Sequence, residues 1–404
     1  IAALLQGEAG VKTPLQQRLT RFGRYLALAV LAICTIVFVA GLLQGQPVLL
    51  MFLTAVSLAV AAIPEALPAV ITVSLAIGAR KLTRHNALIR NLPSVETLGS
   101  VTCICTDKTG TLTENRMTAE SFYCAGEARD ELAAPGQGAC WDELGRAMAL
   151  NNDVISGADG PEGEPTELAL YQAARASGYD KRALELELPR LDAIPFDSSR
   201  KRMSTLHAVQ GAVTAYVKGA PESVIPLCTQ MRSGSGETDC NPQALLDAAA
   251  QLAQRGYRVL AFARRDLASA PGAPDGDTLE RELSFIGLAA LIDPPRAEVP
   301  QAVADCLTAG IKPIMITGDH PGTATAIAHR LGIAGDEHRT LSGEQLAELS
   351  DDELAGAVEA VRVYARVTPE QKLRIVRALQ QCGEFVAMTG EGVNDEPALK
   401  RAGI

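Results

Sequence analysis

Residues 101–111 read VTCICTDKTGT, an uncharged run followed directly by a polar turn. The run Val101–Thr106 is rich in β-branched residues, which favours a buried β-strand. Asp107 follows it, and a carboxylate at a strand end can attack a phosphorus atom and form an acyl phosphate. Alone, an Asp followed by Lys and Thr is more often a turn or a helix cap. Donors for an anionic phosphate are available in the next four residues, Lys108, Thr109, Gly110 and Thr111.

Three later turns make the phosphoryl-transfer interpretation stronger. The turn Thr317-Gly318-Asp319 follows the apolar run Ile311–Ile316 and offers hydroxyl and amide donors. Lys372 stands at the start of a predicted helix, where a cation is unfavourable unless an anion compensates it. Residues 389–395 read TGEGVND and bring carboxylates that suit Mg²⁺. Each turn alone has an ordinary structural explanation, but together, at strand ends, they predict one site.

Short apolar runs and helical stretches alternate in the C-terminal part of the chain, which predicts a parallel sheet covered by helices on both faces. Ligands of such sheets bind at the carboxyl ends of the strands. Residues 117–284 differ, with many Gly, Pro and Ser loops, so we expect them to form a domain inserted into the other. The predicted strands are Val101–Thr106, Phe285–Ile292, Ile311–Ile316 and Glu384–Met388, and the predicted helices are Ala297–Ala309, Pro321–Leu331 and Pro369–Gln380.

The N-terminal part reads as a membrane segment, because Glu65 is the one charged residue between Tyr25 and Ala79. Tyr25–Leu43 is long enough to cross a hydrocarbon core of about 30 Å, and Val48–Ala79 is longer than one straight span needs. Basic residues precede the first span and follow the second, which by the positive-inside rule places both soluble flanks in the cytoplasm. We therefore expect a multi-pass protein of the lipid bilayer with cytoplasmic soluble domains.

The second apolar span carries Ile63–Pro68, which reads IPEALP. Two prolines remove backbone donors, so carbonyls in the preceding turn should lose their helical partners. Glu65 near the bilayer centre would cost about 2.5–3.5 kcal/mol, and a carboxylate beside freed carbonyls is a site that hard cations prefer. The alternative is a kinked helix whose Glu65 is protonated or reaches an interface. The expected ligands of the cation are the carbonyls of Val60, Ala61 and Ile63 and the carboxylate of Glu65.

Composition sets broader limits. A length of 404 residues suggests two or three domains, and a net charge of −10 gives no basic surplus that would point to nucleic acid. Nine cysteines form no zinc-type CxxC pairs, so we expect them to be mostly reduced or buried thiols. The chain begins with Ile1 and ends directly after a motif, so we expect a fragment.

With these motifs in view, the chain resembles the P-type cation-transporting ATPases, which are phosphorylated on aspartate. The resemblance covers essentially all residues, and IPEALP is similar to the IPEGLP-type motif of calcium pumps rather than to the Cys-Pro-Cys of heavy-metal pumps. It favours calcium and leaves proton, sodium or manganese open. The motifs stand in the family's order and approximate spacing: DKTGT (Asp107–Thr111), KGAPE (Lys218–Glu222), DPPR (Asp293–Arg296), TGD (Thr317–Asp319) and GVND (Gly392–Asp395).

The resemblance implies an α/β fold: a haloacid-dehalogenase-like Rossmannoid phosphorylation domain with an inserted α+β nucleotide-binding domain, plus a two-helix transmembrane hairpin. It divides the chain into 1–24 (tail of an actuator domain and linker), 25–80 (transmembrane hairpin), 81–116 and 285–404 (phosphorylation domain) and 117–284 (nucleotide-binding domain).

The resemblance also implies site residues, with ATP and Mg²⁺ as cofactors and a cation as the transported partner. Asp107 would be the phosphorylated nucleophile, and Mg²⁺ would be held by Asp107, Thr109 and Glu391. Without the family resemblance, the simpler interpretation is that Lys201, Lys218 and Arg258 are solvent-exposed basic residues and that Phe196 belongs to the hydrophobic core. The further catalytic residues would be Lys108, Thr111, Thr317, Gly318, Asp319, Lys372, Asn394 and Asp395, and the nucleotide would be bound by Glu167, Phe196, Lys201, Lys218, Gly219 and Arg258.

The sequence departs from the family pattern in three respects. Glu391 stands where Asp is usual, and a shift of about 1 Å in a catalytic group can cost about a hundredfold in rate. Glu396 replaces a usually small residue. We also expect most of the actuator domain and the later transmembrane helices to be missing. These departures motivate an alternative function, a catalytically weakened nucleotide-binding regulatory or assembly partner. A soluble phosphatase of the same fold is disfavoured by the apolar spans.

Overall fold

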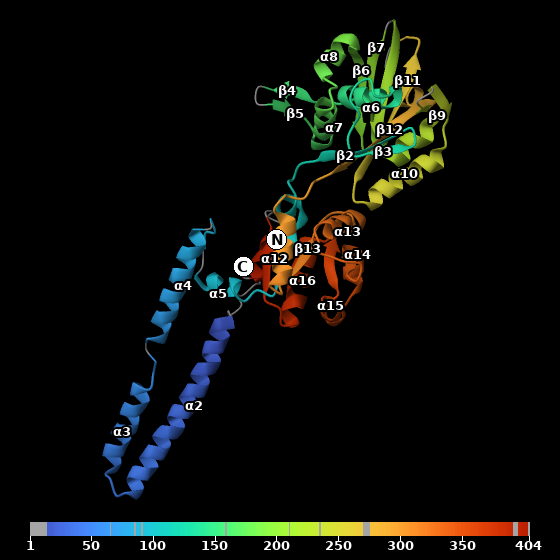
Figure 1. Ribbon diagram of the computed structural model, residues 1–404. Helices are drawn as coiled ribbons and strands as arrows, with labels where there is room; N and C mark the ends of the chain where they lie inside the picture. The colour runs from blue at the N-terminus through green and yellow to red at the C-terminus, as the bar shows by residue number, and fades with distance from the viewer. Residues whose placement is uncertain are drawn as a thin grey trace.

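The computed structural model describes residues 14–64, 66–84, 86–89, 92–157, 160–209, 211–233, 236–269, 275–390 and 395–402. Within these ranges the chain has a helical N-terminal part, a parallel β-sheet and a larger, mostly antiparallel β-sheet (Figure 1).

The N-terminal part consists of α2 (Pro14–Leu43), α3 (Val48–Ala61) and α4 (Leu67–Thr83). Within α2, residues Arg18–Leu43 form the one described helix that is long and apolar enough to cross a membrane. Helix α3 is apolar but shorter, and it packs against α2. The expected second span therefore consists of two helices, α3 and α4. Figure 1 shows them one after the other beside α2. The short helix α5 (Leu92–Leu98) then leads into the parallel sheet.

The break between α3 and α4 is where the two prolines predict it. Ile63 donates its N–H to the carbonyl of Val60 at 3.1 Å, and Leu67 donates to Pro64 at 3.1 Å. The Val60 carbonyl therefore loses its helical partner, as predicted, because Pro64 has no N–H, and a tighter turn from Ile63 replaces the lost bond. Leu67 is the helical partner that the Ile63 carbonyl loses. Glu65 lies outside the described residues.

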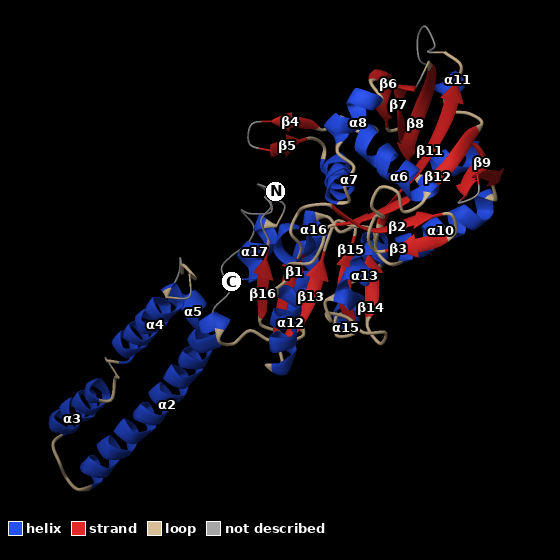
Figure 2. Cartoon of the chain, turned by 45° about the horizontal axis from the view of Figure 1, so that its top comes forward, coloured by secondary structure: helices blue, strands red, loops and turns tan. Residues whose placement is uncertain are grey.

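The parallel sheet has the strand order β14 (Arg339–Ser342), β15 (Val361–Ala365), β13 (Lys312–Ile316), β1 (Cys103–Asp107), β16 (Val386–Thr389). All neighbouring pairs are parallel, and Figure 2 shows the strands side by side with helices around them. In β13, Ile314 and Ile316 belong to one hydrophobic core and Met315 to another, so both faces are covered, as predicted. The helices are α12 (Val299–Thr308), α13 (Pro321–Arg330), α14 (Gly343–Glu348), α15 (Asp351–Ala357), α16 (Pro369–Gln381) and α17 (Glu396–Ala402).

The second sheet has nine strands within the described residues, in the order β10-β9-β12-β11-β8-β7-β6, with β2 paired to β12 and β3 to β2. Its strands are β2 (Thr118–Cys124), β3 (Glu127–Arg129), β6 (Arg190–Asp197), β7 (Arg202–Val209), β8 (Ala212–Gly219), β9 (Cys228–Ser233), β10 (Gly236–Asp239), β11 (Arg258–Leu267) and β12 (Leu283–Ile292). Its helices are α6 (Ala139–Leu150), α7 (Pro165–Ala176), α8 (Lys181–Glu187), α9 (Pro221–Val224), α10 (Pro242–Gln254) and α11 (Gly276–Leu279), and a separate hairpin joins β4 (Ile155–Gly157) to β5 (Gly160–Glu162).

One strand prediction is wrong. Phe285–Ile292 was expected in the parallel sheet, but it is part of β12, which pairs antiparallel with β11 and β2. Every residue of β12 is buried, and a strand buried on both faces gives the same continuous apolar run in either kind of sheet. The domain boundary expected at residues 284 and 285 therefore falls inside a strand. The two crossings between the sheets lie close together, because Thr113 and Pro295 form an isolated antiparallel bridge.

The cysteines largely follow the expectation. Seven of the nine are free thiols, and Cys124 in β2 is joined to Cys140 in α6 by a disulfide.

Candidate functional site

Asp107 is the last residue of β1, which lies between β13 and β16 in the parallel sheet. It stands opposite Ile316 in the strand register, so Thr317 follows at the same edge. The chain then turns sharply: Gly110 has φ 78°, a left-handed conformation that favours glycine. The guanidinium of Arg296 donates to the Gly110 carbonyl at 2.6 Å and holds this turn.

Lys372 brings two carboxylates together at this edge. Its Nζ donates to Asp107 Oδ2 at 2.7 Å and to Asp395 Oδ1 at 2.6 Å. The lysine is in the first turn of α16, whose N-terminus is fixed by a capping box from Thr368. Burial by itself lowers the pKa of Lys372, but the bonds to the two carboxylates outweigh burial and raise the pKa above its usual value. Lys372 is therefore a fixed positive charge at neutral pH.

Lys108 forms a second ion pair beside the first. Its Nζ lies 2.7 Å from Asp319 Oδ2 and 3.8 Å from Asp293 Oδ2. Asp293 also accepts a hydrogen bond from the Thr113 hydroxyl at 2.5 Å, which ties the turn after Asp107 to the end of β12. Asp293 belongs to the DPPR motif but was not among the predicted site residues. The DPPR motif could have indicated this role. Asp293 is buried, and a buried carboxylate needs hydrogen-bonding or charged partners.

The structure thus joins residues that were predicted to lie at one sheet edge. Lys372 binds Asp107 and Asp395, and Lys108 binds Asp319. The remaining predicted residues of this edge follow the same strands: Thr109 and Thr111 are in the turn after β1, and Thr317 and Gly318 follow β13. Thr317 is buried, and its Oγ1 accepts the N–H of Asp319 at 3.2 Å. Glu391 and Asn394 lie outside the described residues.

The antiparallel sheet carries a second polar site around a buried lysine. Lys218 donates to Glu167 Oε1 at 2.6 Å and to the Asn151 carbonyl at 2.5 Å. Burial lowers the pKa of Lys218, and the Glu167 carboxylate opposes this shift. The other oxygen of Glu167 accepts the N–H of Asp153 at 2.9 Å. Asn151 was not predicted, because it is a polar residue after a helix with no motif around it.

The other predicted nucleotide residues lie in or beside strands of the same sheet. Phe196 in β6 is 63% exposed, so it is not a core phenylalanine and presents a free aromatic face. Lys201 has φ 54° and pairs with Glu222 at 3.0 Å. Arg258 donates to the Thr166 hydroxyl at 3.2 Å. Gly219 is required sterically, since a Cβ there would lie 2.4 Å from the Lys201 carbonyl oxygen.

Comparison with known proteins gives one family model and several relatives of this chain. A family model described as "P-type ATPase, cytoplasmic domain N" matches residues 140–298. "Calcium-transporting ATPase 1" of Bacillus cereus is 44% identical over all of this chain and 46% of its own length. "Calcium-transporting ATPase 1" of Lactococcus lactis subsp. lactis is 42% identical over all of this chain and 47% of its own length. "Probable cation-transporting ATPase F" of Mycobacterium tuberculosis is 42% identical over 98% of this chain and 46% of its own length.

The chain belongs to the P-type ATPase family. It spans about half the length of the curated relatives it matches. The family model covers most of the antiparallel sheet and its helices, while the match to the relatives also includes the parallel sheet and the N-terminal helices.

The magnesium ion implied by the P-type ATPase family fits the donors at the strand ends. Asp107 and Asp395 bind the same ammonium group, so their carboxylates converge, and oxygen is the donor that Mg²⁺ prefers. The carbonyl of Thr109, predicted as a ligand, belongs to the turn that directly follows Asp107.

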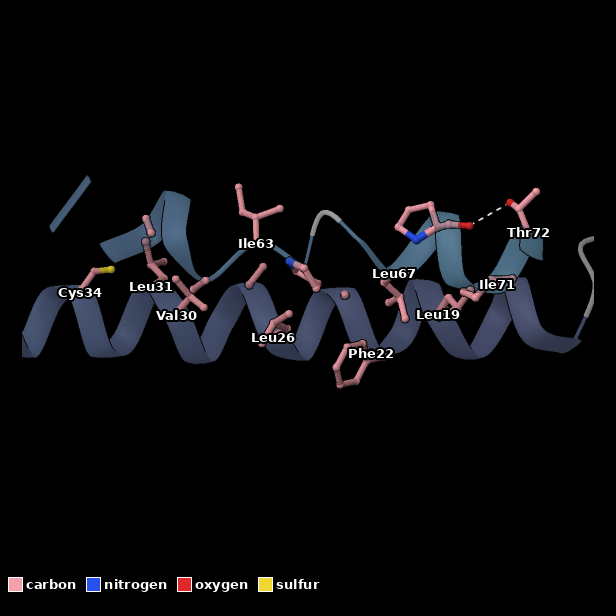
Figure 3. Close-up of a pocket in the computed structure, with 16 residues that line it drawn as sticks. Leu19, Phe22, Leu26, Val30, Leu31, Cys34, Ile63, Leu67, Ile71 and Thr72 are labelled. Carbon is pink, nitrogen blue, oxygen red and sulfur yellow. Dashed lines mark hydrogen bonds between the residues drawn. The ribbon is translucent and has the colours of Figure 1, made fainter. Parts of the chain in front are cut away.

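A cleft of about 690 Å³ lies between α2 and the break in the α3–α4 segment of this P-type ATPase (Figure 3). Its walls are apolar side chains, including Leu26 of α2, Ile63 of the break and Leu67 of α4. Thr72 donates its hydroxyl to the Pro68 carbonyl at 2.8 Å inside α4. In the part of the chain that the structure describes, no cluster of three or more His, Cys, Asp or Glu side chains forms a metal site. The carbonyl-based cation site at Val60, Ala61 and Ile63 remains a prediction.

Proposed function

We propose that this chain carries the phosphorylation site, the nucleotide site and part of the membrane path of an ATP-driven cation pump, with calcium as the favoured cation. The observation that carries the proposal is Lys372, which holds Asp107 beside Asp395 at the carboxyl edge of a parallel sheet. The relatives named above are calcium- or cation-transporting ATPases, which supports a transport function. Their names give no support to a regulatory or assembly partner.

In this proposal the parallel sheet is a haloacid-dehalogenase-like phosphorylation domain, and the antiparallel sheet is the inserted nucleotide-binding domain. We place the crossings between them near residues 113–117 and 293–295, where the chain passes from one sheet to the other. Helices α2 to α4 would lie in the bilayer as a multi-pass segment, with both sheets in the cytoplasm.

The reaction would begin when a carboxylate oxygen of Asp107 attacks the γ-phosphorus of ATP. A new oxygen–phosphorus bond forms, the bond from the γ-phosphorus to the β–γ bridging oxygen breaks, and ADP leaves with that electron pair. Lys372 holds the carboxylate and neutralises charge that accumulates on the phosphoryl oxygens. Thr317 and Gly318 would donate hydrogen bonds to the same oxygens. The product is an aspartyl phosphate on Asp107.

Nucleotide recognition would use the second site. Phe196 offers its exposed face to the adenine ring, and Lys201, Lys218 and Arg258 offer positive charge to the nucleotide. The Glu167 carboxylate would hold the Lys218 ammonium in place. Mg²⁺, held by Asp107 and the Thr109 carbonyl with Glu391, would neutralise phosphate charge when bound.

Cation transport would use the broken segment between α3 and α4. Proline removes helical hydrogen bonds there, and backbone oxygens at such a break can replace the water around a cation. We propose that Glu65 and the carbonyls of Val60, Ala61 and Ile63 supply half of the site. Phosphorylation of Asp107 would then alternate its access between the two sides of the membrane.

Radiolabelled ATP tests the proposal directly on this chain. We expect an acid-stable, hydroxylamine-labile label on the wild type and none on Asp107→Asn. Asp352→Asn is the matched control, because Asp352 is an exposed carboxylate in α15 and should label like the wild type. Persistent label in Asp107→Asn would show that the nucleophile is another residue.

A further inference from the structure

We propose that Lys181 is a positioning residue of the nucleotide site, which it shapes by holding the Asn152–Val154 loop. Its Nζ donates to the Asn152 carbonyl at 3.0 Å, to Asn152 Oδ1 at 2.9 Å and to the Val154 carbonyl at 2.9 Å. All three acceptors belong to one short loop and none is a carboxylate. The inference rests on the proposed nucleotide function of Glu167 and Lys218.

Lys181 is an unusual residue for its place in the fold. It is buried, and it is the first residue of α8, directly after the N-cap Asp180. A cation at a helix N-terminus opposes the helix dipole, and burial of an ammonium group costs solvation. Its nearest carboxylate pairing is with Glu185, at 3.8 Å. An apolar side chain could fill this position without the desolvation cost of a buried ammonium group. What Lys181 adds is therefore its three hydrogen bonds to oxygens of Asn152 and Val154.

The held loop connects directly to the nucleotide site. Asp153, in the middle of the loop, donates its backbone N–H to Glu167 Oε2 at 2.9 Å. The other oxygen of Glu167 accepts Lys218 at 2.6 Å. Lys181 therefore acts through the loop on the carboxylate that orients the Lys218 ammonium.

The start of the loop is also fixed by contacts that do not involve Lys181. Asn152 donates its side-chain amide to the carbonyls of Met148 and Ala149 at the end of α6, at 2.9 and 2.8 Å. Asn151 donates to the Tyr216 carbonyl at 2.9 Å. Arg190 also donates to Asp153 Oδ1 at 2.8 Å, so loss of the Lys181 bonds should leave the sheet intact and loosen the Asp153 segment rather than release it completely.

Calorimetric titration of the 404-residue chain with MgADP tests the inference. We expect Lys181→Met to raise the Kd about tenfold, because a mispositioned Glu167 leaves Lys218 poorly oriented. Lys181→Arg keeps the charge and donors and should restore most of the affinity. Arg182→Met is the matched control, since Arg182 is the next residue of the same helical turn and is exposed. It should bind MgADP like the wild type.

A second readout separates positioning from general stability. Hydrogen exchange at the Asp153 amide should accelerate about tenfold in Lys181→Met, while amides of β7 and β8 keep their rates. At saturating ATP, Lys181→Met should reach the same final phosphorylation level as the wild type. The substitution would then raise the KM for ATP and leave the amount of phosphorylated protein unchanged.

The possible outcomes decide separately on the two proposals. If the wild type binds no MgADP, or Lys218→Met binds as the wild type does, the nucleotide assignment fails. If Lys218→Met weakens binding and Lys181→Met leaves both the Kd and the Asp153 exchange rate unchanged, the role of Lys181 alone is overturned. Should Lys181→Met not fold, Lys181→Gln decides: its amide can replace two of the three bonds, so a rise of about threefold is expected. An unchanged Kd in Lys181→Gln would then overturn the inference.

Discussion

Lys372 lies 2.7 Å from Asp107 and 2.6 Å from Asp395, so one ammonium group holds two carboxylates that come from separate segments of the chain. Without that cation, the two acidic side chains would repel each other at a distance where the protein screens charge poorly. The lysine therefore determines where Asp107, the proposed nucleophile, stands.

Removing this charge should abolish most of the phosphorylation. We expect Lys372→Met to lower the initial rate of label incorporation from ATP about 100-fold or more, since a preorganised donor is lost beside the reacting groups. Rapid-quench labelling measures this rate. Lys312→Met is the matched control, because Lys312 also pairs with a carboxylate, Glu384 at 2.7 Å, but at the opposite end of the strands. Equal rates in Lys372→Met and the wild type would contradict the assignment.

The gathering of Asp107, Lys372 and Asp319 at one sheet edge, the proposed phosphorylation site, could be predicted from sequence because these residues follow strands. Parallel strands place their carboxyl ends at one edge, so an uncharged run followed by DKTGT, and a mostly apolar run followed by TGD, predict neighbours in space. Strand β15, which precedes Lys372, was not predicted because Arg362 interrupts its apolar run VRVYA. Strand β12 was assigned to the wrong sheet because its continuous apolar run fits a buried strand of either kind of sheet.

The proposed nucleotide site was less accessible to prediction from the sequence. Lys218 and Glu167 were found through the family resemblance, but Asn151 and the loop after it were not. The loop contacts Lys218 and Glu167 through the backbone carbonyl of Asn151 and the backbone amide of Asp153, and such contacts leave no requirement on the side chain that a pattern could reveal. The Val60 carbonyl shows the same limit, because proline predicts the lost bond and not the turn that replaces it.

Gly219 should tolerate no side chain. In Gly219→Ala the new Cβ would lie 2.4 Å from the Lys201 carbonyl oxygen and 2.5 Å from Arg202 Cβ, so the Lys201 segment must move. Overpacking costs about 1–3 kcal/mol, and we expect MgADP to bind about tenfold more weakly. Gly356→Ala is the control, because Gly356 has open space around it and is in helix α15, where alanine is favourable. Equal affinity in the two variants would contradict this prediction.

Glu280 should be essential for the stability of the antiparallel domain. Its side chain is fully buried and accepts bonds from Arg200 and Arg202, each at 2.6 Å. Burial alone would raise the pKa of Glu280, but the bonds from the two arginines and Ser204 hold the pKa below its usual value. Glu280→Ala leaves two cations without their anion and should lower the free energy of unfolding by about 3–5 kcal/mol.

Urea unfolding measures this loss, and a neighbouring residue provides the comparison. Glu282 is two positions away and pairs with Arg265 at 3.2 Å, but its side chain is 70% exposed. Exposed pairs contribute about 0–1 kcal/mol, so Glu282→Ala should be almost neutral. If the two variants lose the same free energy, burial is not what makes the Glu280 cluster important.

His207 should make the protein less stable in weak acid. Burial lowers the pKa of His207 to about 4, and its two ring nitrogens lie 3.0 Å from the Leu188 carbonyl and from the Thr205 hydroxyl. The unfolded chain, with an ordinary histidine pKa near 6.5, therefore binds more protons than the folded chain between about pH 6.5 and pH 4. The free energy of unfolding should fall as the pH falls through this window, by at most about 3 kcal/mol.

Unfolding in urea at pH 7 and at pH 5 measures the His207 effect. His207→Gln removes the titrating group, so its free energy of unfolding should be lower at pH 7 but should depend less on pH over this window. His329→Gln is the control, because His329 is exposed, and it should keep the pH dependence of the wild type. Since carboxylates titrate in the same range, the decisive quantity is the difference in slope between the two variants. Equal slopes would show that His207 is not the buried base responsible.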